Sequence, residues 1–344
     1  MEDLKAWFPI KSGITQKTTG HVKAVDGVSL KVRKGETYGL VGESGSGKTT
    51  LVKSILHLIK PTSGRVRFDG IDLGKAKRTE IDKIRRKMQI IFQDPYASLD
   101  PRKTVLSALT EPMRIHKVAE SKATAVRTAI GLMTKVGLNR EHLYRYPHEF
   151  SGGQRQRIAI ARSLAVEPEF IVLDEPTSFL DVSVQAQILE LLNKLQREMN
   201  LTYLFVSHNL SVVQHISDRV GVMYLGKIVE EAASKIVYKS AEHPYSHYLM
   251  TAIPVPDPGF VRKEQPLTGD VPSPVNVPTG CRFHPRCRYA TEKCTVDEPR
   301  LYVAGKTHLV ACHYDINFLK HRSKLRQMSN SISLRVKKSK AQRL

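Results

Sequence analysis

Short apolar runs of strand length recur along the chain and end in polar residues. The clearest are residues 170–173 (Phe-Ile-Val-Leu) and 203–206 (Tyr-Leu-Phe-Val), and a third, 38–41, leads into a glycine-rich segment. Continuous apolar runs of this length are typical of parallel strands buried on both faces, and ligands gather at the carboxyl ends of such strands. The pattern therefore predicts an α/β fold whose chemistry lies at one edge of a parallel sheet.

Other segments surround these runs. Residues 24–41 read as two short strands around the turn at 34–36, residues 64–73 as a strand pair, and 88–92 as a buried strand. Residues 49–58 have helical periodicity that stops before Pro61, which cannot continue a helix. From about 95–101 to 163 the pattern is mostly helical, which indicates a helical subdomain.

The composition changes after about residue 250, where prolines become frequent and all four cysteines lie. A proline-rich stretch of this kind favours a stiff, extended linker over a packed element. We therefore expect four parts, in chain order: a large α/β domain at 1–253, a linker at 254–278, a cysteine appendage at 279–318 and a basic tail at 319–344.

Overall composition is that of a globular protein, with 41% hydrophobic and 25% charged residues. No apolar run approaches the roughly 18–20 residues needed to cross a bilayer, and the first residues lack a secretion signal, so we expect a cytoplasmic chain. The formal net charge is +21, and nine Lys or Arg residues without an acid lie between Lys320 and Leu344. Such a tail could be solvated and poorly ordered, or could meet anionic lipid, nucleic acid or an acidic partner.

Residues 42–49 match the phosphate-loop pattern in full. They are Gly42, Glu43, Ser44, Gly45, Ser46, Gly47, Lys48 and Thr49, and we include Thr50, the next residue, in the expected binding set. Glycines let successive backbone N–H groups point at phosphate oxygens, the lysine supplies positive charge and the Thr49 hydroxyl can ligate Mg²⁺. Since a strand precedes the loop and a helix follows it, the segment predicts ATP binding.

Asp174 and Glu175 follow the apolar run at 170–173. Phosphoryl transfer needs an acidic partner for the metal and a base for the attacking water, and two adjacent carboxylates suit these tasks. We assign Asp174 to the Mg²⁺ shell and Glu175 to polarising the water.

Residues 150–157 (Phe-Ser-Gly-Gly-Gln-Arg-Gln-Arg) lie between the phosphate loop and the acidic pair. This order of motifs resembles the ATP-binding cassette (ABC) ATPases. The resemblance implies an ABC-type P-loop NTPase, with a parallel-sheet core, an antiparallel β subdomain and a helical subdomain. It also implies that Ser151, Gly152, Gly153 and Gln154 close over the ATP held by another subunit.

The same resemblance assigns two further residues. Gln93, after the strand at 88–92, would be the glutamine that reaches Mg²⁺ and the γ-phosphate, and His208, after the run at 203–206, would be the switch histidine beside Glu175. A lone Gln or His in such places is otherwise a surface or core residue, so both roles depend on the cassette context.

Three positions depart from the family pattern. Phe179 stands where a small residue is usual, so the seam between subunits could be repacked. Asn209 replaces the common acidic residue after the switch histidine. Residues 9–37 contain no Phe, Tyr or Trp to stack on adenine, which leaves His21, or Trp7 or Phe8 if the strand folds back.

Cys281, Cys287, Cys294 and Cys312 are the chain's only cysteines. Disulfides are rare in cytoplasm, so four thiolates converging on a metal is the sharper reading. The spacing lacks the Cys-x2-Cys pairs typical of zinc sites, and an iron–sulfur cluster, zinc and free thiols all stay open on the residues alone. No cysteine neighbours a nucleotide motif in sequence, so we expect the appendage to act independently of ATP hydrolysis.

Residues 280–287, after Pro272-Ser273-Pro274 and His243-Pro244-Tyr245, resemble the C-terminal extension of oligopeptide and dipeptide importer ATPases. The motifs at 24–30 and 183–187 resemble the F-type subunit of that family. This resemblance implies a [4Fe–4S] cluster on the four cysteines and ATP-driven peptide import. It also implies a sister ATPase, two membrane permeases and an extracytoplasmic binding protein as partners, and a place at the cytoplasmic face of the membrane.

Alternatives remain. Related systems import oligosaccharides. The charge also admits a soluble cassette protein acting on nucleic acid or ribosomes, but the short distance from phosphate loop to Ser151 and the presence of one cassette argue against it, so we expect no nucleic acid partner. A redox or iron sensor would use the cysteines and leave the ATPase motifs without a role.

Overall fold

The computed structural model describes residues 1–13, 16–253, 267, 269–305 and 307–315. Within them the main sheet has the strand order β12-β13-β11-β10-β3-β9-β8-β7. The strands are β3 (Thr37–Val41), β7 (Met88–Ile91), β8 (Phe170–Asp174), β9 (Thr202–Val206), β10 (Arg219–Tyr224), β11 (Lys227–Ala233), β12 (Tyr302–Gly305) and β13 (His308–Val310). From β7 to β10 neighbouring strands are parallel. The predicted α/β fold with a parallel core is confirmed.

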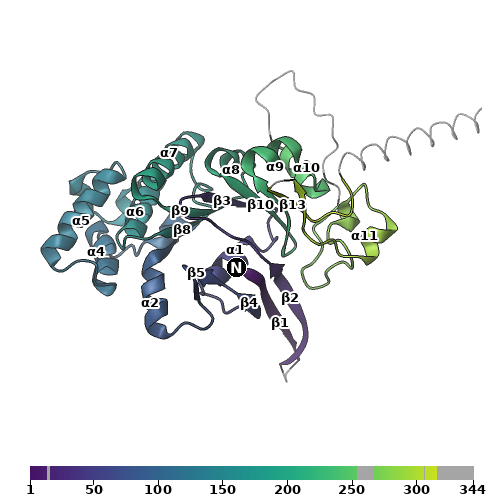
Figure 1. Cartoon of the computed structure of the whole chain (residues 1–344). Helices are drawn as coiled ribbons and strands as arrows, with labels where there is room; N and C mark the ends of the chain where they lie inside the picture. Colours follow the sequence, from purple (N-terminus) through teal and green to yellow (C-terminus); the bar gives the residue numbers. More distant parts are fainter. Residues whose placement is uncertain (14–15, 254–266, 268, 306, 316–344) are drawn as a thin grey trace, which may run out of the picture.

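Both faces of this sheet are covered, which explains the continuous apolar runs (Figure 1). Alternate residues of β8 enter two separate hydrophobic clusters: Phe170 and Val172 pack in one, Ile171 and Leu173 in the other. Helix α1 (Lys48–Ile55) covers the first face, and α6 (Gly152–Leu164), α7 (Val182–Met199) and α8 (Leu210–Ile216) cover the second. A strand whose two faces are both buried has no polar positions to alternate with apolar ones.

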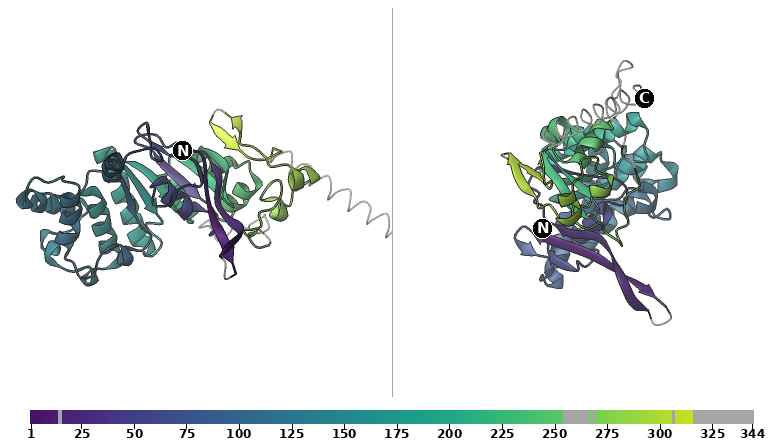
Figure 2. Two further views of the ribbon diagram at one scale, coloured as in Figure 1. Left: turned by 90° about the horizontal axis from the view of Figure 1, so that it is seen from below. Right: turned by 90° about the vertical axis from the view of Figure 1, so that its right-hand side faces the viewer.

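A second, antiparallel sheet has the order β2-β1-β4, with β1 (Glu2–Ser12), β2 (Lys17–Val28) and β4 (Ser63–Arg65). Its β1–β2 ribbon extends away from the main sheet in both views of Figure 2. A hairpin of β5 (Arg67–Phe68) and β6 (Ile71–Asp72) and helix α2 (Arg78–Lys87) follow. The sequence pattern did not predict β1, because its residues do not form an apolar run.

The predicted helical subdomain lies at one end of the molecule (Figure 1). It contains α3 (Pro95–Ser98), α4 (Val105–Ile115), α5 (Lys122–Lys135), the short 3₁₀ helices η1 (Arg140–Tyr144) and η2 (Pro147–Glu149), and the start of α6. Pro147 begins η2, where its missing N–H is harmless, and the buried Phe150 follows it.

The C-terminal part lies at the other end and continues the main sheet (Figure 1). It follows α9 (Ser234–Ser240) and α10 (Pro244–Thr251), and comprises η3 (His284–Arg286), α11 (Glu292–Val296), β12 and β13. Strand β13 pairs with β11, and Phe283 packs against Tyr224 and Tyr245 with ring centroids 5.3 and 5.4 Å apart. The segment expected as a separate appendage therefore shares its sheet and core with the α/β domain.

Most of the expected proline-rich linker and all of the basic tail lie outside the described residues. At the described end of the linker, the Pro274 carbonyl accepts a 3.0 Å hydrogen bond from the Lys23 N–H of β2. No helix among the described residues is long and apolar enough to span a bilayer.

Candidate functional site

The phosphate loop connects β3 to α1, as the sequence predicts. Gly47 precedes α1 with a φ of 104°, and a Cβ there would lie 2.1 Å from the Ala24 carbonyl oxygen. Only glycine fits such a position, because an L side chain is strained at this φ and would also clash with β2. Gly47 therefore lets the phosphate loop lie directly against β2, and α1 begins at the next residue, Lys48.

Lys48, the first residue of α1, folds over the loop. Its Nζ donates to the carbonyl oxygens of Gly42 and Glu43 at 2.8 and 2.9 Å and to Ser46 Oγ at 3.3 Å. Burial lowers the pKa of the Lys48 ammonium, while the Glu175, Asp174 and Glu43 carboxylates act in the opposite direction. The ammonium is thus held inside the loop, at the place where phosphate oxygens would need a cation.

A cavity of about 660 Å³ opens in front of this loop. The residues that line it include Gln93, Glu175 and His208, which the sequence predicts as site residues and which are far apart in the chain. The remaining lining residues are Val22, Ala24, Ser44, Gly45, Gly47, Lys48, Thr49, Thr50 and Pro274. The structure therefore brings the expected catalytic residues to the expected phosphate site.

Glu175 lies at the centre of a hydrogen-bonded group. Its Oε2 accepts from Gln93 Nε2 and from Ser178 Oγ, both at 2.9 Å, and its Oε1 lies 3.0 Å from His208 Nδ1. Its backbone has a positive φ of 49° and its N–H donates to the Val206 carbonyl of β9 at 2.8 Å. Such a φ is uncommon outside glycine and needs surrounding structure to hold it.

The two carboxylates at the end of β8 have opposite pKa shifts. Burial disfavours the charged form of Glu175, but the hydrogen bonds from His208 and Ser178 outweigh it, so its pKa is lowered. Burial, followed by the neighbouring Glu175 charge, raises the pKa of Asp174. Glu175 is therefore held in its ionised form, the form that can accept a proton, and Asp174 is a buried carboxylate whose charge a cation would stabilise.

The signature residues at 151–154 form the start of α6. Ser151 Oγ accepts from the Gln154 N–H at 3.3 Å, and Gln154 Oε1 accepts from the Ser151 N–H at 3.0 Å, which is a capping box. Gln154 thus shapes the turn. In the described part of the chain, none of the four residues lines the phosphate cavity.

The segment after Glu175 packs beside this signature. A Cβ on Gly152 would lie 3.5 Å from Leu180 Cδ2, and one on Gly153 would lie 2.5 Å from Val184 Cγ1. Phe179, the unusual residue at this place, has 65% of its surface exposed. Asn209 caps α8, since its Oδ1 accepts from the Val212 N–H at 3.3 Å, a role that an acidic residue at this position would fill equally well.

The three aromatic candidates for adenine lie on different faces of the β1–β2 ribbon. Trp7 pairs with Lys23 and its ring centroid lies 6.1 Å from that of His21, so these side chains share a face. Phe8 pairs with Val22, which lines the phosphate cavity. Side chains alternate along a strand, so Phe8 is the candidate on the cavity side and Trp7 and His21 point away.

The four cysteines lie in one region, but the described residues contain no group of three or more His, Cys, Asp or Glu side chains placed to hold a metal ion. The Cys281 N–H donates to the Cys294 carbonyl at 2.9 Å. Burial raises the pKa of Cys281 to about 11 and of Cys287 and Cys312 to about 12, and neighbouring thiols contribute to each shift. The thiols are thus close enough to influence one another's charge.

Sequence reasoning missed several residues that hold the site. Ser178 bonds Glu175, Tyr245 accepts from the Glu43 N–H at 2.9 Å, and Arg286 pairs with the Glu43 carboxylate. The signal for the last two was present, because the resemblance already included the segments around Tyr245 and Arg286. Nothing in the spacing showed that these segments reach the phosphate loop.

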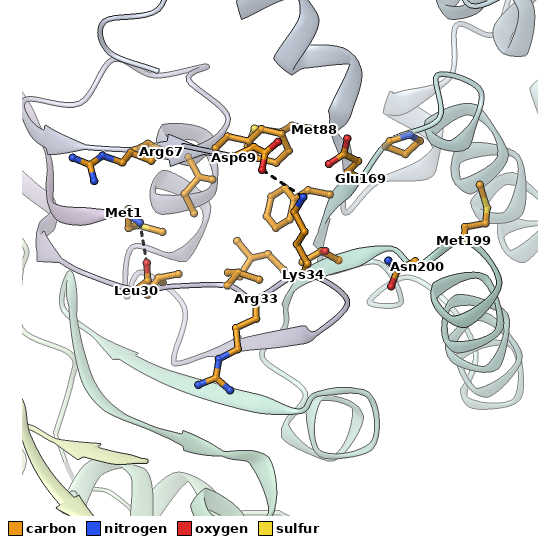
Figure 3. A pocket seen from close by; sticks show the side chains of 18 residues that line it. Met1, Leu30, Arg33, Lys34, Arg67, Asp69, Met88, Glu169, Met199 and Asn200 are labelled. Carbon is orange, nitrogen blue, oxygen red and sulfur yellow. Dashed lines mark hydrogen bonds and ion pairs between the residues drawn. The ribbon is translucent and has the colours of Figure 1, made fainter. Parts of the chain in front are cut away.

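A second cavity, of about 400 Å³, contains none of the predicted site residues (Figure 3). It lies at the opposite edge of the sheet, where Met88 and Phe170 begin β7 and β8, and its rim carries the Lys34–Asp69 ion pair at 3.4 Å. The candidate site is therefore the cavity at the phosphate loop.

Two family models match the chain. The ABC transporter model matches residues 25–178, and the model of the oligopeptide/dipeptide transporter C-terminal region matches residues 229–294, which include Cys281, Cys287 and Cys294. Two relatives from Bacillus subtilis strain 168 cover most of both chains. The oligopeptide transport ATP-binding protein AppF is 49% identical over 91% of this chain and 96% of its own, and the putative oligopeptide transport ATP-binding protein YkfD is 50% identical over 85% and 89%.

Solved structures agree with these matches. The dimeric ATP-binding cassette MJ0796, in a post-hydrolysis state bound to ADP and Pi, has a TM-score of 0.60 at 31% identity and covers 68% of this chain and 97% of its own. The cassette cbiO1 from Clostridium perfringens has a TM-score of 0.58 at 28% identity and covers 70% and 91%. Fold, motif geometry and sequence identity over nearly the whole length thus agree: the chain belongs to the ATP-binding proteins of ABC transporters that carry the oligopeptide/dipeptide transporter C-terminal region.

Proposed function

We propose that this chain is the ATP-hydrolysing subunit of a transporter that imports peptides. The observation that carries the proposal is the hydrogen-bonded group of Gln93, Glu175 and His208 at the mouth of the phosphate loop. The C-terminal family match and the relatives' names support peptide as the substrate class over oligosaccharide.

In the proposed reaction the loop and Lys48 hold the phosphates of ATP. When bound, Mg²⁺ would be held by Thr49, Gln93 and Asp174 and would neutralise negative charge on the phosphates. Glu175 accepts a proton from the attacking water, and its lowered pKa keeps it ionised for this task. His208 and Gln93 orient the Glu175 carboxylate through their hydrogen bonds.

We further propose that the site is completed by a second ATPase subunit. Ser151 and the backbone N–H groups at the start of α6 are available to an anion, because helix N-termini carry partial positive charge, yet they do not line the phosphate cavity of their own chain. A sister ATPase would present its cavity to them. The exposed Phe179 directly precedes Leu180, which packs beside Gly152, and we propose that it enters the seam.

The remaining partners follow from the family. Two membrane permeases would bind the ATPase pair at the cytoplasmic face of the membrane, and an extracytoplasmic binding protein would deliver the peptide. We propose no nucleic acid partner, because the residues of the site are accounted for by ATP chemistry.

The four cysteines are proposed to bind a [4Fe–4S] cluster through Cys281, Cys287, Cys294 and Cys312. Support comes from the confinement of the chain's four cysteines to residues 281–312. Iron and sulfide content after anaerobic purification tests this. Stoichiometric zinc in colourless protein would contradict it.

The function is tested by producing the full chain with its permeases and sister ATPase in vesicles. Peptide uptake should require ATP and should stop in Lys48→Ala, which lacks the ammonium inside the loop. A library of oligosaccharides is the matched substrate control. Uptake of oligosaccharide without peptide uptake, or ATP hydrolysis stimulated only by RNA, would overturn the proposal.

A further inference from the structure

The second residue of the phosphate loop, Glu43, is gripped by the C-terminal segment. Arg286 Nη1 donates to Glu43 Oε2 at 2.6 Å, and Nη2 donates to Oε1 at 3.1 Å. This is a forked pair of charge-assisted hydrogen bonds, the geometry that fixes a carboxylate in both position and orientation. Only 7% of the Arg286 side chain is exposed, so solvent screens the pair weakly.

Glu43 is also held by its backbone. Its N–H donates to Tyr245 Oη at 2.9 Å, and its carbonyl oxygen accepts from Lys48 Nζ at 2.9 Å. The same residue is thus fixed at three points, and one of them is the lysine that faces the phosphates. The carboxylate held by Arg286 and the carbonyl bound by Lys48 belong to the same residue, so a change in the position of the Glu43 side chain can shift the carbonyl that positions Lys48.

Arg286 is in turn fixed by the cysteine segment. It ends η3, whose first N–H, that of His284, donates to the Cys281 carbonyl at 2.9 Å, and Cys287 follows directly. Arg282, next to Cys281, forms a buried ion pair with Asp26 of β2 and a hydrogen bond to the Leu225 carbonyl. Arg282 and Arg286 therefore attach the turn from Cys281 to Cys287 to the nucleotide-binding domain.

We propose that Arg286 is a positioning residue of the phosphate loop, through which the cysteine segment sets the affinity for ATP. This inference rests on the proposed ATPase function. With the fork intact, the loop is held in one arrangement before the nucleotide binds, and less ordering is needed on binding. Arg286 touches none of Gln93, Glu175 and His208 through any hydrogen bond or ion pair between described residues, so the chemical step should depend on it less than binding does.

The test compares full-length variants by their Kd for ATP and by their kcat and KM. Arg286→Gln should raise the Kd and KM about tenfold, the scale of a hydrogen bond to a charged group, with kcat within about twofold. Arg286→Lys keeps the charge without the fork and should fall between wild type and Arg286→Gln. Arg288→Gln, an exposed arginine two residues further on, is the matched control and should bind like wild type.

A double-mutant cycle separates coupling from general damage. Glu43→Gln should weaken binding about as much as Arg286→Gln, and the double variant should be no weaker than either single variant. Cys287→Ser should raise the Kd in the wild-type background and have no further effect with Arg286→Gln, because its influence runs through that residue.

Wild-type affinity in Arg286→Gln and Glu43→Gln, or additive effects in the double variant, would overturn the inference while leaving the ATPase function intact. Failure of the wild-type chain to bind ATP would instead overturn the proposed function. If Arg286→Gln does not fold, as shown by thermal unfolding, Arg286→Lys and Glu43→Gln decide the question, since each retains a polar partner at the same place.

Discussion

Nδ1 of His208 lies 3.0 Å from Oε1 of Glu175, while the other oxygen of the same carboxylate is already shared by Gln93 and Ser178. The ring nitrogen must carry a proton to make this bond, since an ionised carboxylate only accepts. A water acting at the γ-phosphate would therefore meet a carboxylate whose orientation is fixed from three different parts of the chain.

Glu175→Gln should abolish hydrolysis while leaving ATP binding intact. The amide keeps the size of the side chain but cannot take a proton, and loss of a general base costs at least about 100-fold in rate. ATP-bound subunit pairs should accumulate, because hydrolysis no longer separates them. Phosphate release and gel filtration with ATP measure both effects, and hydrolysis near the wild-type rate would remove Glu175 from this role.

His208→Ala should slow hydrolysis by about 10²-fold and should also change its pH dependence. The hydrogen bond from His208 lowers the pKa of Glu175, so without it the pKa rises and the acid side of the pH–rate profile moves to higher pH. Ser178→Ala removes the other hydrogen bond that lowers the pKa of Glu175, which has a smaller effect than the bond from His208. It is the matched comparison and should shift the pH–rate profile less. An unshifted pH–rate profile in His208→Ala would show that His208 does not lower the pKa of Glu175.

Gly153→Ala should destabilise the signature region, because the added Cβ would lie 2.5 Å from Val184 Cγ1. Valine is stiff at χ1, and overpacking of this kind costs about 1–3 kcal/mol. Adding Val184→Ala should restore much of the thermal stability. Gly152→Ala is the control, since its Cβ would meet Leu180 at an ordinary 3.5 Å. Equal melting temperatures for both alanine variants would contradict the packing argument.

The buried pair of His308 and Glu230 should make stability fall at alkaline pH. His308 Nε2 lies 2.7 Å from Glu230 Oε1, and this hydrogen bond outweighs burial and raises the pKa of His308 above 6.5. A raised folded-state pKa means that the charged ring stabilises the fold. That contribution is complete below pH 6.5 and is lost as the pH rises through the folded-state pKa.

Thermal unfolding between about pH 6 and pH 9 measures this contribution, which should be on the order of 1–3 kcal/mol. His308→Gln should flatten the pH dependence by lowering stability at the acid end. The exposed His215→Gln should leave it unchanged. A wild-type curve that rises with pH over this range, or one that His308→Gln does not alter, would show that the pair is not the titrating element.

The sequence allowed the phosphate loop, the strand ends and the helical subdomain to be predicted because each depends on local spacing. The apolar runs at 170–173 and 203–206 predict that Glu175 and His208 lie at the same edge of the sheet. The bond between Glu43 and Arg286 joins residues 243 positions apart, and no local pattern encodes such a distance.

The expectation that the cysteine segment acts independently of ATP hydrolysis stays a prediction, although the segment does contact the nucleotide-binding domain. It relied on separation in sequence, but Arg282 and Arg286, beside two of the cysteines, reach Asp26 and Glu43. Strand β13 was missed for a similar reason, because three residues, His308–Val310, give too short a pattern to identify.

Strand β13 makes the C-terminal part a poor candidate for truncation or exchange. A chain cut after α10 would leave β11 as an open sheet edge, which invites pairing with other molecules, and Glu230 would lose its partner His308. A hybrid that receives this region from a related ATPase would need compatible residues at 43, 26 and 230. Any redesign of the C-terminal part must therefore include the residues of the phosphate loop and of β2 and β11 that contact it.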